Sequence, residues 1–69
     1  MALKLNEGED LLLPCRSCAT LCIHFRVSAG ASTLLCPRCY RASEVFCERR
    51  EGGWAIRVMA DGQLVAMWE

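Results

Sequence analysis

Two pairs of cysteines have the residue type and spacing of metal ligands. Cys15 and Cys18 form one Cys-x-x-Cys motif, and Cys36 and Cys39 form a second one after 17 intervening residues. Two such tight turns that face each other supply the four thiolates of a tetrahedral Zn²⁺ site. A gap of 17 residues lies within the range of about 15–20 that is typical of this pattern. The spacing therefore predicts one structural Zn²⁺ held by these four cysteines, with no open coordination position.

The size of the chain also favours a bound metal. A chain of 69 residues is expected to form one domain, whose core alone contributes about 3–5 kcal/mol at most. The N-terminal residues contain no signal-peptide-like apolar run, and no segment has the length of a membrane span. We therefore expect a cytoplasmic protein without membrane association, in which thiols bind metal more often than they form disulfides. A Cys22–Cys47 disulfide remains an alternative under oxidising conditions.

Positive charge is concentrated around the cysteine motifs. Residues 15–50 carry six Arg and two Glu, whereas the segments on either side each have a net charge of −2. A Zn²⁺ ion bound by four thiolates adds a charge of −2. Residues 15–50 with the metal bound are therefore only modestly basic. Side chains on or beside the motifs are suited to contacting phosphates or stacking on a base. The candidate nucleic-acid-binding residues are Arg16, Arg38, Tyr40 and Arg41. The alternative role of the arginines is to supply solubilising charge.

Three further side chains of metal-ligand type are left over, namely Cys22, His24 and Cys47. They could form a second metal site or exchange with a ligand of the first one, but a second site would have only these three obvious ligands. We therefore expect the two cysteines to pack as small half-buried side chains, and His24 to have a surface or packing role. No pair of nucleophile and base and no phosphate-binding loop is visible, so we expect no enzymatic activity.

Short strands are expected to position the motifs. Alternating or apolar runs predict strands, and no helical stripe of ten or more residues is present. Small residues over 28–32 predict a turn, residues 33–35 lead back to the second motif, and residues 40–45 could form one helical turn at most. The predicted strands before the C-terminal part span residues 2–5, 10–14, 21–27 and 44–48.

Residues 54–68 predict a β-hairpin. Asp61 and Gly62 are a favoured type I′ pair for its tip, and the resulting register places Ile56 opposite Met67. Both faces of this hairpin are largely apolar, so either both are buried or one contacts a partner. Trp and Met are enriched in contact surfaces. The candidate interface residues are Trp54, Ile56, Met67 and Trp68. The alternative is that the hairpin tryptophans form the small core of the chain itself.

The motifs resemble those of the zinc-ribbon class. The resemblance rests on Cys15-Arg16-Ser17-Cys18 and Cys36-Pro37-Arg38-Cys39 among short strands and covers about residues 11–50. It implies a small all-β fold with two zinc knuckles, to which a C-terminal hairpin is added. Cys-Pro-x-Cys also occurs in rubredoxins, which hold iron in the same geometry. Ribbons usually place Gly after the second Cys of each knuckle, where this chain has Ala19 and Tyr40.

A narrower resemblance is to the small Com-like zinc-finger regulators of phages, which are linked to translational control through mRNA binding. It rests on Cys36-Pro37-Arg38-Cys39 and on the overall layout. Two functions therefore remain open. One is a nucleic-acid-binding regulator that uses the Arg-bearing knuckles, and the other is an adaptor or inhibitor that docks on a protein or on a second copy through the hairpin.

Overall fold

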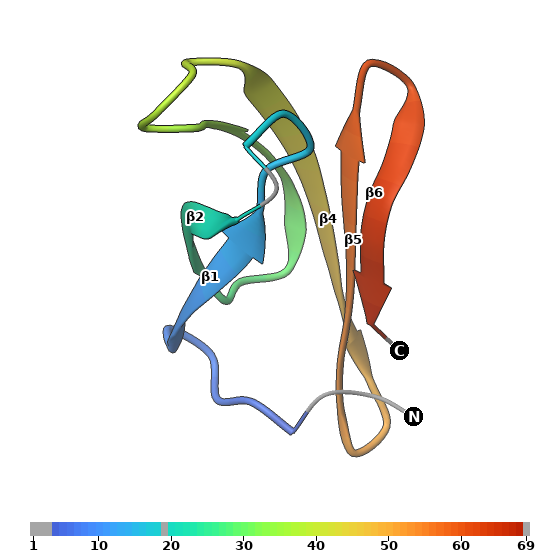
Figure 1. Ribbon diagram of the computed structural model, residues 1–69. Coiled ribbons are helices and arrows are strands. Elements are labelled where there is room, and N and C mark those ends of the chain that lie inside the picture. Colours follow the sequence, from blue (N-terminus) through green and yellow to red (C-terminus); the bar gives the residue numbers. More distant parts are fainter. Residues whose placement is uncertain (1–3, 19, 69) are drawn as a thin grey trace.

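The computed structural model describes residues 4–18 and 20–68, which form six strands and no helix (Figure 1). β1 and β2 form a two-stranded sheet, and the other strands form a four-stranded sheet in the order β3-β4-β5-β6. All pairs are antiparallel. The predicted small all-β zinc-ribbon fold is thereby confirmed. The strands are β1 (Asp10–Pro14), β2 (Leu21–Arg26), β3 (Gly30–Leu35), β4 (Ala42–Arg50), β5 (Gly53–Ala60) and β6 (Gln63–Trp68).

Each cysteine motif lies in a hairpin loop. The first connects β1 to β2, and the second connects β3 to β4. Both loops lie at the same end of the molecule, at the top of Figure 1. The two hairpins therefore bring the motifs together, although they belong to different sheets. Among the residues described, no helix is long and apolar enough to cross a membrane.

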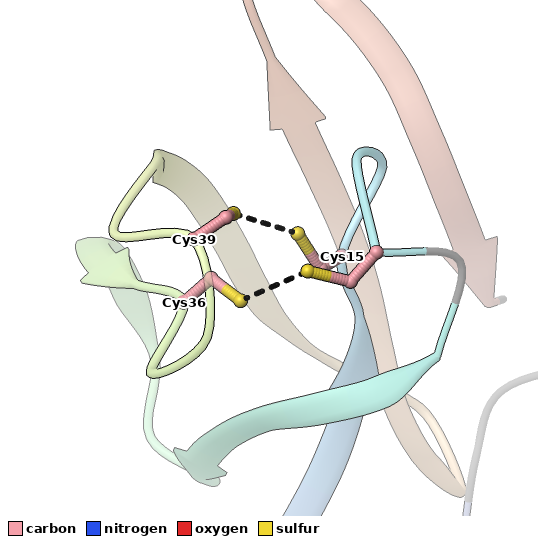
Figure 2. A group of neighbouring side chains, drawn as sticks. Cys15, Cys36 and Cys39 are labelled. Carbon is pink, nitrogen blue, oxygen red and sulfur yellow. Dashed lines mark hydrogen bonds between the residues drawn. The ribbon is translucent and has the colours of Figure 1, made fainter.

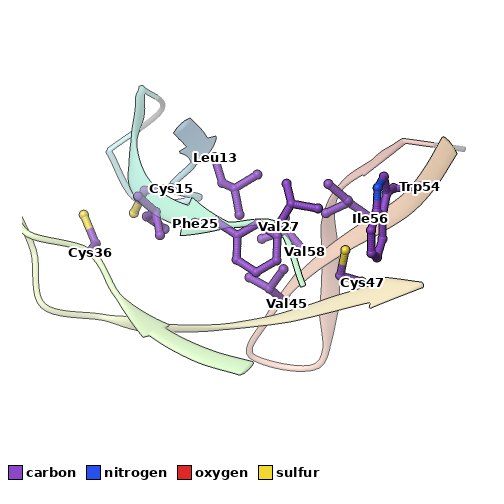
Figure 3. Packing of buried hydrophobic residues seen from close by; sticks show 11 residues of the cluster. Leu13, Cys15, Phe25, Val27, Cys36, Val45, Cys47, Trp54, Ile56 and Val58 are labelled. Carbon is purple, nitrogen blue, oxygen red and sulfur yellow. The ribbon is translucent and has the colours of Figure 1, made fainter. Parts of the chain in front are cut away.

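The core lies between the β1–β2 hairpin and one face of the four-stranded sheet. Phe25 and Val27, from β2 and the residue after it, are buried in one cluster with Val45 of β4 and Val58 of β5 (Figure 3). This burial confirms the predicted alternation of residues 21–27, except that Leu21 at its start is 61% exposed. The cluster extends from the cysteines at one end to Trp54 at the other (Figure 3).

Several strands differ from their predicted bounds. β3 begins at Gly30, where a turn is predicted, because Gly30 pairs with Cys47. β4 begins at Ala42, which pairs with Leu35, so this pairing replaces the helical turn allowed for residues 40–45. Of the strand predicted over residues 2–5, residues 2 and 3 lie outside the described part of the chain. Residues 4 and 5 are not in a strand.

The tip of the C-terminal hairpin is as predicted, but its register is not. Asp61 and Gly62 have φ of 52° and 74°, as a type I′ turn requires. A bulge then shifts the β5–β6 pairing, so that Ile56 lies opposite Trp68. The predicted pairing of Ile56 with Met67 is wrong, because one extra residue of β6 is accommodated at the bulge. Met67 therefore shares a face with its actual partner Arg57, on the side away from the core.

Candidate metal centre

The four cysteines of the two motifs are positioned to bind one metal ion. Their sulfur atoms all lie within 4.8 Å of one another. Across the two knuckles, Cys15 Sγ lies 3.6 Å from Cys39 Sγ, and Cys18 Sγ lies 3.7 Å from Cys36 Sγ (Figure 2). A tetrahedron with metal–sulfur bonds of about 2.3 Å has edges of about 3.8 Å. Four thiolates at these separations fit Zn²⁺ and leave no coordination position for a substrate.

The two knuckles are closed by equivalent backbone hydrogen bonds. The Cys15 N–H donates to the Thr20 carbonyl, and the Cys36 N–H donates to the Arg41 carbonyl, both at 3.0 Å. Each bond joins the first cysteine of a motif to the residue five positions later. These bonds close the two loops in the same way and present both pairs of sulfur atoms at one end of the molecule.

Tyr40 takes the backbone conformation that ribbons usually obtain from glycine. Its φ is 60°, in the left-handed region that side chains other than glycine rarely adopt. Its N–H donates to the Cys36 carbonyl at 2.9 Å. The second knuckle thus keeps its turn without the usual glycine. Ala19, the equivalent position in the first knuckle, lies outside the described residues.

Backbone N–H groups favour a thiolate at Cys36. Hydrogen bonds from the N–H groups of Cys39 and Arg38 lower the pKa of Cys36 to about 6, against burial, which opposes the charge. The Arg38 nitrogen lies 3.4 Å from the Cys36 sulfur. Burial, followed by side-chain hydrogen bonds to neighbouring cysteines, raises the pKa of Cys18 to about 12. In the folded chain, the surroundings of Cys36 thus favour the thiolate, and those of Cys18 favour the neutral thiol.

Basic and aromatic residues lie on or beside the two knuckles. Arg16, Arg38 and Arg41 are all exposed, and Tyr40 is 76% exposed. Arg16 and Arg41 line one small hollow, together with Asp61 from the tip of the β5–β6 hairpin. The fold thus brings Arg16 of the first motif next to Arg41, which follows the second motif.

The other described arginines have partners within the chain. Arg26 lies 3.7 Å from Asp10, and Arg50 lies 3.2 Å from Glu48. Arg49 and Arg57 lie over the rings of Trp54 and Phe46, with 5.2 and 5.5 Å from guanidinium carbon to ring centroid. Within residues 4–18 and 20–68, no such ion pair or ring contact involves the three arginines around the metal centre.

The candidate interface residues of the hairpin do not share one surface. Trp54 and Ile56 are only 2% and 1% exposed and belong to the core of this chain. Trp68 is half-buried, whereas Met67 is 51% exposed. Leu64, which is equally exposed, was not among the predicted interface residues. The bulge explains this omission, because it places Leu64 and Met67 on one face.

The three leftover ligand-type residues lie apart. His24 is exposed on β2, and Cys47 is buried on β4, where burial raises the pKa of its thiol. Cys22 is half-buried, and its sulfur lies 3.5 Å from that of Cys36. None of the six cysteines forms a disulfide. In the described part of the chain, the two motifs form the only group of three or more such ligands.

The sequence allows Cys22 to exchange with a ligand of the first site, but half-buried packing is the preferred prediction, and the contact of its sulfur with that of Cys36 is not predicted. Cys22 shares a strand face with His24 and Arg26, which points to a position away from the core. Its distance of four residues from Cys18 is the one signal that places it next to the first knuckle.

Comparison with known proteins gives no match. The chain matches no model of a protein family, no curated protein and no solved structure. The metal centre and the surface around it are therefore the basis for inferring a function.

Proposed function

We propose that this chain is a metal-stabilised module that binds single-stranded nucleic acid and regulates transcription or translation. The supporting observation is that three exposed arginines on or beside the two knuckles, Arg16, Arg38 and Arg41, have no ion pair or ring contact among the described residues, and that Tyr40 beside them in the sequence is exposed as well. Arginines that are not already paired are available to phosphates, whereas the other described arginines would first have to leave a carboxylate or an aromatic ring.

Tyr40 is the proposed stacking residue. Its ring is largely exposed, although its backbone has an unfavourable positive φ. Stacking of a base on an aromatic side chain contributes about 1–3 kcal/mol. The neighbouring Arg38 and Arg41 would contact the phosphates on either side of a stacked base. Asp61, which shares a hollow with Arg41, limits the width of this basic surface.

The metal has a structural role in this proposal. Four thiolates complete its coordination, so it offers no position for substrate. It holds the two knuckles together and thereby fixes the spacing between Arg16 on one and Arg38 on the other. The chain acts by binding rather than by catalysis.

Fluorescence anisotropy with labelled single-stranded RNA and DNA, at low salt, tests this function. Tyr40→Ala and Arg38→Ala should each weaken binding about 10-fold, in line with the loss of one stacked base or one charged contact. Arg26→Ala is the matched control, because Arg26 is paired with Asp10 and should have little effect. Absence of binding to both nucleic acids at low salt would refute the proposal.

A second candidate function is protein binding at the outer face of the hairpin. Leu64 and Met67 are both half-exposed there. Met67 and Trp68 also border a hollow of about 280 Å³ with Phe46. Sedimentation velocity over a range of concentrations tests self-association, and Met67→Lys should abolish any dimer. A monomer at every concentration would leave only a different protein as the partner.

A further inference from the structure

A fifth thiol contacts the metal centre. Cys22 Sγ lies 3.5 Å from Cys36 Sγ, a separation no longer than those between ligands of opposite knuckles. Cys22 is at the start of β2, beyond the first knuckle, whereas Cys36 opens the second knuckle. The first hairpin therefore places a third thiol beside the centre, in contact with Cys36 but outside the group of four sulfurs that lie within 4.8 Å of one another.

Two of these thiols flank the same ligand. Cys36 Sγ has Cys18 Sγ at 3.7 Å and Cys22 Sγ at 3.5 Å. The second cross-knuckle pair, Cys15 and Cys39, is at 3.6 Å. Cys18 and Cys22 are thus alternative neighbours of Cys36, while the opposite edge of the tetrahedron, between Cys15 and Cys39, includes neither of them.

We propose that Cys22 is a reserve ligand, which can occupy the coordination position of Cys18. In the exchange, the Cys22 thiol releases its proton and forms a bond to the metal. The bond between the metal and the Cys18 sulfur breaks, and that sulfur takes up a proton. The number of thiolates, the metal charge and the oxidation state of every sulfur are unchanged, so no oxidant or reductant is needed.

The exchange has two measurable consequences. The centre tolerates the loss of Cys18, because Cys22 can supply the fourth thiolate beside Cys36. It does not tolerate the loss of Cys39, which lies next to Cys15 across the knuckles. A fifth thiol next to the bound metal also offers a path for stepwise ligand exchange. Metal therefore leaves the wild-type centre faster than it leaves a centre without Cys22.

Binding of Co²⁺ tests the first consequence, because its absorption reports the number of bound thiolates. The variants are Cys18→Ser, Cys22→Ser, the double variant and Cys39→Ser, with Cys47→Ser as a control for loss of a buried thiol. Cys18→Ser should keep a four-thiolate spectrum, whereas the double variant should bind about 10–100-fold more weakly with a three-thiolate spectrum. Cys39→Ser should resemble the double variant. Identical spectra and affinities for Cys18→Ser and the double variant would refute the proposal.

Metal release tests the second consequence with all four primary ligands intact, so it does not depend on the folding of Cys18→Ser. Zinc-loaded wild type and Cys22→Ser are mixed with an excess of a chromophoric chelator, and the release of zinc is followed over time. Wild type should release zinc faster than Cys22→Ser. Equal rates would show that Cys22 only fills space beside Cys36, and would overturn the role proposed for it.

Discussion

The indole of Trp54 donates a hydrogen bond to the carbonyl of Leu5, with 3.0 Å between Nε1 and the oxygen. This bond attaches the segment before β1 to β5, at the end of the core opposite the metal centre (Figure 3). The fold is therefore held at two ends by different chemistry, a cluster of thiols at one and a buried indole at the other.

Trp54→Phe should reduce the free energy of unfolding by about 1–3 kcal/mol, because it removes this hydrogen bond and part of a buried ring. Denaturation of the metal-loaded protein measures the change. Trp68→Phe is the matched control, since Trp68 is only half-buried and should cost less. Equal losses for the two variants would show that the bond to Leu5 contributes nothing of its own.

Removal of the metal should unfold most of the tertiary structure. Metal binding to four thiolates contributes on the order of 10 kcal/mol to folding, more than a core of this size supplies. Addition of a chelator at pH 7 should abolish the near-ultraviolet circular dichroism of the tryptophans, and readdition of Zn²⁺ should restore it. A spectrum that is unchanged after the metal has been shown to leave would contradict a structural role.

Metal affinity should increase with pH. A cysteine thiol in an unfolded chain ionises only above pH 7, and burial in the folded chain raises the pKa of Cys18 to about 12, so this thiol is protonated at pH 7 in either state of the metal-free chain. Metal must displace this proton, so binding is weaker at low pH and strengthens as the pH rises, by about tenfold per pH unit for each proton released. Titration calorimetry in buffers of different ionisation enthalpy counts the protons. An affinity that is constant between pH 6 and 8 would contradict this expectation.

Tyr40→Gly should be more stable than Tyr40→Ala by about 1 kcal/mol, because glycine adopts a positive φ without steric strain. Both variants lose the exposed ring, so the comparison isolates the backbone. Thermal unfolding of the metal-loaded forms measures the difference. Both should also lose nucleic-acid binding to the same extent, which separates the proposed stacking role of Tyr40 from its effect on stability.

Binding to single-stranded nucleic acid should weaken with salt. Three arginine–phosphate contacts predict a slope of about −2 for log affinity against log salt concentration. Arg41→Ala should reduce the steepness of this slope by about 0.7, as expected for one lost contact. A slope near zero in the wild type would mean that Arg16, Arg38 and Arg41 do not bind phosphates.

Local signals in the sequence account for much of this structure. The cysteine spacing predicts the four-sulfur cluster, because the geometry of tetrahedral coordination restricts which spacings can work. The Asp61-Gly62 pair predicts the hairpin tip, because both residues must adopt positive φ. The period of two in residues 21–27 likewise identifies the buried face of β2.

Features that depend on contacts between elements were not predictable. The bulge in the β5–β6 pairing exchanges the faces of Met67 and Trp68, and no turn or breaker residue in β6 marks it. The contact between Cys22 and Cys36 depends on how the two hairpins pack, which strand periodicity does not specify. The positive φ of Tyr40 is indicated only by the resemblance to zinc ribbons, which place Gly at this position, because tyrosine itself rarely adopts it.

The strand order has a consequence for how the chain folds. Every strand pairs only with a neighbour in sequence, and no pairing joins the two sheets. Local pairings of this kind form quickly, so the slow step should be the docking of the β1–β2 hairpin onto the four-stranded sheet. A metal bound between the knuckles closes a loop of 17 residues across that contact, which lowers the entropy of the undocked state. Metal supply would then determine how fast the chain folds as well as how stable it is.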